Sequence, residues 1–146
     1  MNVYGGSCHC SAIKVALRSL KTGAELGARS CQCSFCRAHG ASWTSDAGGA
    51  LEIEVTGPVS RYRFGTGTAE FLICATCGVV PAVIWQDDER LLGVVRVDCL
   101  QERSSFLAHA APTDFEGEGV EQRLARRSQK WTPAAMKDAA GSLKRP

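Results

Sequence analysis

Seven of the eight cysteines in this chain fall into three short clusters, a spacing typical of proteins that bind metal through thiolates. The clusters are Cys8 with Cys10, Cys31 with Cys33 and Cys36, and Cys74 with Cys77. A structural zinc is closed by four protein ligands, whereas a reactive zinc keeps one position open beside three. Because seven cysteines divide into four and three, the chain is predicted to hold two zinc ions, one structural and one reactive.

Disulfide bonds are the competing use of so many cysteines. Pairs spaced C-x-C and C-x-x-C are poorly suited to joining distant parts of a chain. The first residues also show no charged segment followed by an apolar one, so no secretory signal is expected. A reducing, cytoplasmic setting is therefore predicted, in which such patterns usually indicate metal binding or catalysis.

The set of four requires two distant cysteine pairs to meet. Cys8 and Cys10 come just before the first predicted strand, and Cys74 and Cys77 come just after a later one. Two strand ends can meet around one ion, and Gly78 allows a tight turn after the second pair. These four cysteines are predicted to hold the structural zinc, which would contribute directly to folding.

The set of three, Cys31, Cys33 and Cys36, has no further pair to complete it. His39 and Cys99 are the candidates for a fourth ligand; if neither binds, the position is open to water or substrate. Three thiolates give a zinc ion a net negative charge, which suits it to bind and activate another thiolate. Two alternatives stay open: a second structural zinc closed by His39, and a redox dithiol at Cys33 and Cys36.

The elements that must position these cysteines read mostly as short strands. Residues 13–17 and 51–55 alternate apolar and polar side chains with the period of two that turns one face of a strand inward. Further strands are expected at residues 60–64, 70–73, 82–85 and 91–97, separated by turn-forming residues. The pattern predicts an all-β, mainly antiparallel, zinc-binding domain over residues 1–107.

Helix is expected mainly near the C-terminus. Thr132 is a suitable cap before Pro133, and residues 134–140 are good helix formers that Gly141 would terminate. Residues 108–119 mix proline, aspartate and glycine and are expected to form a connecting loop. Residues 108–146 are therefore predicted to form a loop and a basic, partly helical C-terminal tail.

Composition indicates an ordinary globular chain: 45% of residues are hydrophobic and 22% charged, with no apolar run near the ~20 residues of a membrane span. No membrane partner is expected. The net charge of +2 conceals an asymmetry, because residues 120–146 carry +5 and the rest carries −3. A basic segment can bind nucleic acid or another acidic partner, but a solvated tail is the simpler interpretation because no aromatic series accompanies the charges.

The cysteine motifs resemble those of the family of glutathione-dependent formaldehyde-activating enzymes and centromere protein V. The resemblance rests on Gly-Ser-Cys-His-Cys at residues 6–10, Cys-Gln-Cys-Ser-Phe-Cys-Arg at residues 31–37 and Cys-Ala-Thr-Cys-Gly at residues 74–78. It runs from about Tyr4 to Leu100. Ser11 departs from the family's pattern, which usually has glycine there.

The resemblance implies an Mss4-like, zinc-stapled β fold. It implies structural zinc at Cys8, Cys10, Cys74 and Cys77 and catalytic zinc at Cys31, Cys33 and Cys36. It also implies a carbon–sulfur lyase that forms or releases S-hydroxymethylglutathione from formaldehyde and glutathione.

Arg37, beside the second cluster, is a candidate catalytic residue that would neutralise a substrate carboxylate or a developing alkoxide; a surface salt bridge is the alternative. Two other functions stay open for the whole chain. One is a non-catalytic zinc-binding module whose basic tail contacts nucleic acid or an acidic partner. The other is a carrier that binds glutathione without turning it over.

Overall fold

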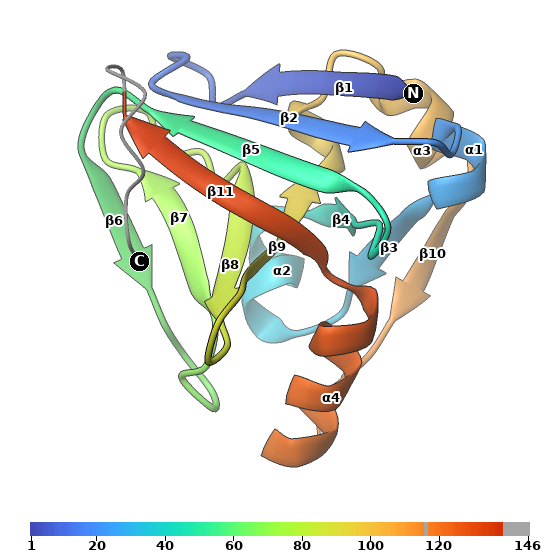
Figure 1. The fold of residues 1–146 in the computed structure, drawn as a ribbon. Coiled ribbons are helices and arrows are strands. Elements are labelled where there is room, and N and C mark those ends of the chain that lie inside the picture. The colour runs from blue at the N-terminus through green and yellow to red at the C-terminus, as the bar shows by residue number, and fades with distance from the viewer. Residues whose placement is uncertain (116, 139–146) are drawn as a thin grey trace.

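Strands dominate the part of the chain that this computed structural model describes, residues 1–115 and 117–138 (Figure 1). Within it, eleven strands hydrogen bond into one continuous network, and only two of the paired neighbours, β3 with β10 and β5 with β11, run parallel. The prediction of a mainly antiparallel β fold is therefore confirmed. The strands divide into two sheets joined along β9 and β11.

The first sheet combines strands from both ends of the chain. Its order is β1 (Asn2–Ser7), β2 (Ile13–Ser19), β5 (Ala50–Val55) and β11 (Thr132–Asp138). Along β2, Ile13, Val15 and Leu17 are buried, whereas Lys14 and Arg18 are exposed. The alternation that predicted this strand is therefore also what turns its apolar face into the core.

The second sheet carries the remaining strands. Its order is β6 (Val59–Tyr62), β7 (Glu70–Cys74), β8 (Ala82–Gln86), β9 (Leu91–Arg96), β4 (Ser42–Thr44), β3 (Ala28–Cys31) and β10 (Ala110–Thr113). The four strands predicted after residue 59 are confirmed, with ends shifted by at most two residues. A short 3-10 helix (Val97–Cys99) replaces the expected end of β9.

β11 links the two sheets. Thr132 and Pro133 pair with Gly93 and Leu92 of β9, and from Ala134 onward the strand pairs with β5. The predicted helix over residues 134–140 is therefore wrong as far as Asp138; residues 139 and 140 lie outside the described part. Helix propensity is a weak preference, and it is outweighed here because β11 pairs with β9 at Thr132 and Pro133 and with β5 from Ala134 to Asp138.

The helix of this region lies earlier, at α4 (Val120–Lys130), directly before β11. The segment expected to connect, residues 108–119, includes β10. The boundary predicted at residue 108 stays a prediction, but β10 and β11 hydrogen bond across it to β3, β5 and β9.

Two apolar clusters lie on opposite faces of β8 and β9. Ala82, Ile84 and Val95 join the core that also contains Leu51 and Ile53 of the first sheet, and this core lies between the sheets. The other cluster contains the alternate residues Val83, Leu92 and Val94 together with Trp43, Trp131 and Cys36. β8 and β9 of the second sheet are thus buried on both faces, and Cys36 of the second cysteine cluster packs on the outer one.

Three further helices lie at the edges of the sheets: α1 (Gly23–Leu26), α2 (Ser34–His39) and α3 (Arg103–Leu107). Phe106 of α3 is fully buried and packs edge-on against Tyr4, with ring centroids 4.9 Å apart. Among the described helices, none has the length and apolar character needed to cross a membrane.

Candidate metal centres

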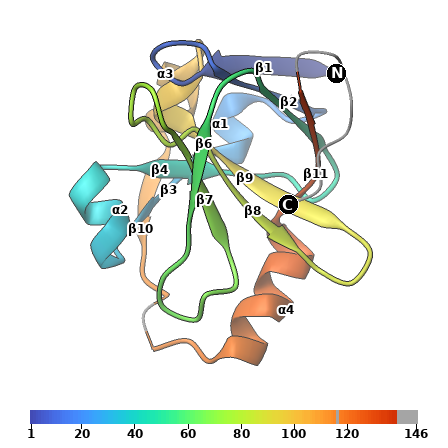
Figure 2. The ribbon, with the colours of Figure 1, turned by 90° about the vertical axis from the view of Figure 1, so that its left-hand side faces the viewer.

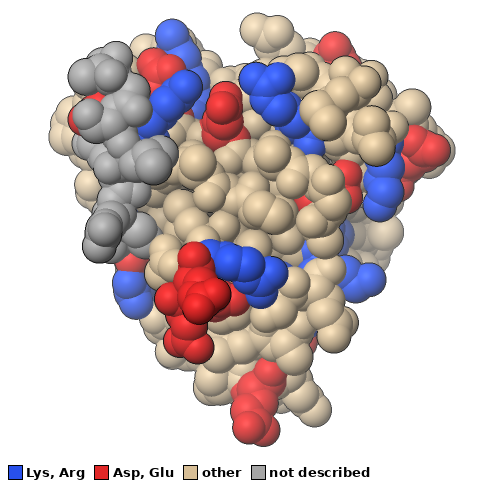
Figure 3. Space-filling model, in the orientation of Figure 1, with Lys and Arg blue, Asp and Glu red and all other residues tan. Residues whose placement is uncertain are grey.

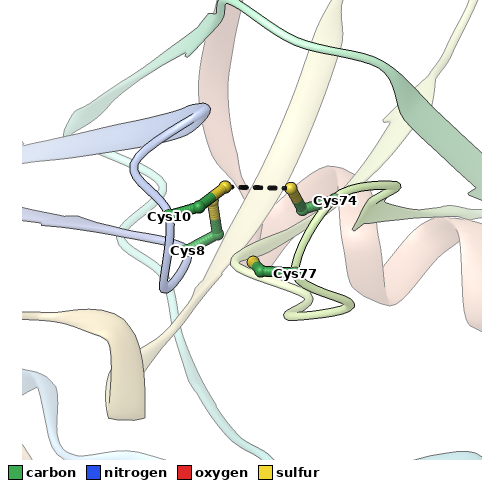
Figure 4. A group of neighbouring side chains, drawn as sticks. All are labelled: Cys8, Cys10, Cys74 and Cys77. Atoms are coloured by element: carbon green, nitrogen blue, oxygen red, sulfur yellow. Dashed lines mark hydrogen bonds between the residues drawn. The ribbon is translucent and has the colours of Figure 1, made fainter.

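Cys8, Cys10, Cys74 and Cys77 converge from two loops, as predicted (Figure 4). Their sulfur atoms all lie within 4.8 Å of one another, with 3.8 Å between the Sγ atoms of Cys8 and Cys10 and 3.5 Å between those of Cys10 and Cys74. A zinc ion with Zn–S bonds of about 2.3 Å separates tetrahedral sulfur ligands by roughly 3.8 Å. The four-cysteine group therefore has the size that a tetrahedral metal ion requires.

Local backbone geometry shapes both loops of the four-cysteine group. Cys8 follows β1, and its Sγ accepts a hydrogen bond from the backbone N–H of Ile13 at 3.2 Å. Cys74 ends β7, and the backbone N–H of Gly78, at φ +81°, donates to its carbonyl at 2.8 Å. Gly78 takes this left-handed conformation without strain because it has no Cβ, which is the turn expected from the sequence.

Backbone donors favour the thiolate form of Cys77, whereas at Cys10 a backbone hydrogen bond that lowers the pKa is outweighed by the neighbouring thiol of Cys74 and by burial, which raise it to about 11. Hydrogen bonds from the backbone N–H groups of Val79 and Cys10 lower the pKa of Cys77 to about 6. Such donors stabilise a negatively charged sulfur, and metal ligands must be deprotonated. The loop is therefore suited to bind a cation at neutral pH.

Cys31, Cys33 and Cys36 form a second group at the junction of β3 and α2. Cys31 ends β3, Cys33 is the N-cap of α2 and its Sγ accepts the backbone N–H of Cys36 at 3.4 Å. The three sulfur atoms lie within 4.8 Å of one another. All eight cysteines are free thiols, so the three-cysteine group is also able to bind a metal ion.

The three thiols do not ionise alike. A hydrogen bond from Cys36 lowers the pKa of Cys31 to about 6, helped by the backbone of Cys33 and the charge of Arg126. The same contact raises the pKa of Cys36, which is also desolvated. Cys31 is therefore the thiol that ionises more readily, and its thiolate accepts a hydrogen bond from Cys36.

Neither proposed fourth ligand joins the three-cysteine group in the described part of the chain. The His39 ring stacks on Phe35 with centroids 4.5 Å apart, and the residue is exposed. Cys99 ends the 3-10 helix, where its electrostatic neighbours include Cys8 and Cys77. Burial raises its pKa to about 11. Residues 1–115 and 117–138 therefore supply three ligands to this group.

A cavity of about 530 Å³ opens beside the three-cysteine group, and Cys31, Cys33 and Cys36 all line it. Much of its wall is aromatic: Trp43, Phe64, Phe71, Phe115 and Trp131. Its walls come from β3, α2, the turn between β6 and β7, and α4, which Figure 2 shows around one end of the molecule. Sites of this size bind small organic molecules.

Four arginines also line the cavity: Arg29, Arg123, Arg126 and Arg127. Sequence reasoning missed them, although two signals were available. Arg29 precedes Cys31 by two residues in a strand, which places both side chains on one face. Arg123, Arg126 and Arg127 are spaced as neighbours on one face of a helix.

Arg37 takes no part in the wall of this cavity. It is exposed in the last turn of α2 and is absent from the lining residues. Of the glycine-rich turn between β6 and β7, Gly65 and Thr66 do line the cavity.

Comparison with known proteins agrees with this arrangement. A family model described as glutathione-dependent formaldehyde-activating enzyme matches residues 3–114. Among solved structures, the chain is similar to a crystal structure of a Rhodobacter sphaeroides protein, with 31% identity and a TM-score of 0.51 over 67% of this chain and 88% of that one.

A short match to curated proteins has a different character. Over 51 residues, 35% of this chain, it is 37% identical to the 4-hydroxy-tetrahydrodipicolinate synthases of two Prochlorococcus marinus strains, MIT 9303 and MIT 9313. The chain spans only 17% of those enzymes. The family match, in contrast, covers most of the 146 residues and includes both cysteine groups. The chain belongs to the family of glutathione-dependent formaldehyde-activating enzymes.

Proposed function

We propose that this chain is a zinc-dependent carbon–sulfur lyase that forms or cleaves a thiol–aldehyde adduct of the S-hydroxymethylglutathione kind. The proposal rests on one observation: three cysteine sulfurs within 4.8 Å of one another stand in the wall of an open cavity. The four-cysteine group, by contrast, brings four sulfur atoms within 4.8 Å of one another, which is the number of ligands that a structural zinc binds. We assign the structural ion to Cys8, Cys10, Cys74 and Cys77 and the catalytic ion to Cys31, Cys33 and Cys36.

Zinc fits both groups because thiolates are soft ligands that select it. When bound at three thiolates, zinc would leave one position open to a substrate thiol, and coordination there would lower the pKa of that thiol. The protein's own contribution is to hold that ion in the wall of a partly aromatic cavity, where a dielectric constant below that of bulk water strengthens electrostatic interactions.

The reaction that this site suits joins a thiolate sulfur to the carbon of an aldehyde. One carbon–sulfur bond forms, the carbon–oxygen double bond becomes single, and the proton lost by the thiol ends on the oxygen. No oxidant or reductant is required, and the reverse step releases the aldehyde. Arg29 and the arginines of α4 supply positive charge along the cavity wall, so they stabilise anionic groups there.

Arg37 is not assigned this role, because it is exposed and lies outside the wall. An Arg37→Ala protein is expected to keep its kcat/KM. A drop of tenfold or more, at about 1.4 kcal/mol for each factor of ten, would return Arg37 to the mechanism.

Metal content and turnover of the Cys36→Ser protein test the proposal. Elemental analysis is expected to find two zinc ions per chain in the wild type and one in Cys36→Ser, with iron measured in the same samples. Formation of the hydroxymethyl adduct from glutathione and formaldehyde, followed by NMR exchange, is expected to be accelerated by the wild type and not by Cys36→Ser.

Two matched variants complete this experiment. Cys99→Ser makes the same change outside both cysteine groups and is expected to keep two ions and full turnover. Because Cys36 is buried, Cys33→Ser at a half-buried position provides a second test in case Cys36→Ser misfolds. Two zinc ions in a folded Cys33→Ser protein, or glutathione binding without acceleration, would overturn the proposal, and the latter would indicate a carrier.

A further inference from the structure

One wall of the cavity comes from residues that follow the matched family segment. The family match ends at residue 114, whereas Phe115, Glu118, Arg123, Arg126 and Arg127 all line the cavity. They belong to α4 and the segment before it. This wall, the arginine wall, lies in the same cavity as the three-cysteine group and holds three of the four lining arginines.

The described lining is strongly cationic. It contains four arginines and a single carboxylate, that of Glu118. The Nη2 of Arg29 donates to the Ser45 hydroxyl at 2.8 Å. The described lining therefore carries a net charge of +3, an arrangement that attracts anions.

Arg127 is the most deeply placed of these arginines. Only 6% of its surface is exposed, its Nη1 donates to the Thr68 hydroxyl at 2.6 Å, and its guanidinium lies 4.9 Å from the Trp131 ring. Its buried Nε has no hydrogen-bond partner among the described residues. Burial, and then the charges of Arg123 and Arg126, lowers its pKa to about 10. An anion in the cavity would accept a hydrogen bond from Arg127 and would offset its repulsion by Arg123 and Arg126.

Arg126 already demonstrates the geometry of carboxylate binding. Its Nε and Nη2 each donate to an oxygen of Glu118 at 3.1 Å, while its guanidinium stacks 3.6 Å from the Phe115 ring centre. Arg123 approaches the same carboxylate at 3.6 Å. This bidentate pairing is the arrangement by which arginine recognises a carboxylate.

We propose that the arginine wall, together with Arg29, is the subsite that binds the carboxylate groups of the thiol substrate. The proposal rests on the function proposed above and identifies the residues of this chain that would bind the substrate's carboxylates in the cavity of about 530 Å³. In this arrangement the thiol end meets Cys31, Cys33 and Cys36, and the carboxylate end meets Arg126 and Arg127. Specificity is thus set by a segment beyond the matched family region.

The test compares glutathione with its diethyl ester, which keeps the thiol and loses both negative charges. The Arg126→Gln protein is expected to raise the KM for glutathione about tenfold or more and to leave the KM for the diester unchanged. Arg126→Lys, which keeps the charge but not the two-pronged geometry, is expected to lie between them. Lys130→Gln removes a charge from an exposed position of the same helix and is expected to match the wild type.

A binding measurement separates this proposal from the proposed reaction. Titration calorimetry with S-methylglutathione, whose thiol is blocked, is expected to show binding to the wild type and about tenfold weaker binding to Arg126→Gln. Binding of S-methylglutathione by a protein that does not turn over glutathione would refute the proposed reaction and support the subsite. Turnover with equal KM values for glutathione and its diester would keep the reaction and overturn the subsite.

Discussion

At the scale of residues, Ser11 adopts an unusual backbone conformation in the loop that holds Cys8 and Cys10. It has a φ of +68° and is the only described non-glycine residue with a positive φ. It follows Cys10 directly, and its backbone N–H donates to the carbonyl of Cys8 at 3.2 Å, which closes the loop between the first two ligands. A side chain in this left-handed conformation costs about 1–2 kcal/mol, a cost that glycine avoids.

Ser11→Gly is therefore expected to stabilise the protein. Relief of strain outweighs the extra flexibility of glycine in the unfolded chain, about 0.4–1 kcal/mol, so a net gain of about 0.5–1 kcal/mol is expected. This corresponds to a rise in Tm of roughly 2 °C, measurable by calorimetry. Ser11→Ala keeps the Cβ and is expected to give no gain; a lower Tm for Ser11→Gly than for Ser11→Ala would contradict the strain.

At the scale of elements, β11 makes the C-terminal region part of the core. It lies between β5 and β9, and Met136 is 2% exposed within the cluster between the two sheets. The helix before it is also anchored, since the Ser45 hydroxyl donates to the carbonyl of Lys130 at 2.8 Å. Together these contacts place the arginines of α4 over the three-cysteine group.

Met136→Ala measures how far the fold depends on β11. The change is expected to cost about 2–5 kcal/mol in the free energy of unfolding because it leaves a cavity between the sheets. Ala135→Ser, at the neighbouring exposed position, is expected to remain within about 0.5 kcal/mol of the wild type. Equal unfolding midpoints for the two proteins in denaturant would mean that β11 is not part of the cooperative core.

At the scale of the whole molecule, the four-cysteine group joins the two sheets. Cys8 and Cys10 lie between β1 and β2 of the first sheet, whereas Cys74 and Cys77 follow from β7 of the second. β11 joins the same sheets through continuous hydrogen bonding. A metal ion at the four cysteines would therefore contribute to the stability of the complete fold.

Loss of that ion is expected to unfold the protein. Structural zinc contributes an apparent ~10–16 kcal/mol in zinc-finger peptides, which is as large as the ~5–15 kcal/mol that separates most folded proteins from their unfolded state. Cys74→Ser should therefore lose its far-UV circular dichroism spectrum, as should the wild type after complete chelation. Cys99→Ser is the control, and a folded Cys74→Ser protein with its full metal content would refute the assignment.

The folded molecule distributes the charged residues differently from the linear sequence. Figure 3 shows Lys and Arg interspersed with Asp and Glu on the face of Figure 1. Three of the seven basic residues in the predicted basic tail, Arg123, Arg126 and Arg127, line the cavity. Binding of nucleic acid by this region stays an untested alternative, and these three side chains lie in the wall of the cavity.

The sequence by itself determined the features that depend on near neighbours. Alternating residues predicted β2 and β5, and cysteine spacing predicted both metal-binding groups, because strand periodicity and the reach of a short loop are local properties. The motifs also indicated the family. Local preference failed at β11, where alanines that favour helix lie in a strand.

Only the tertiary structure decided which distant residues share a site. In the folded chain, the arginines of α4 line the same cavity as Cys31. Arg29 also lines this cavity, whereas Arg37 does not. The tertiary structure also separated His39 and Cys99 from the three-cysteine group. The physical reason is that these outcomes depend on contacts across the sheets, whose free energy exceeds local conformational preferences and leaves little trace in the spacing of residues.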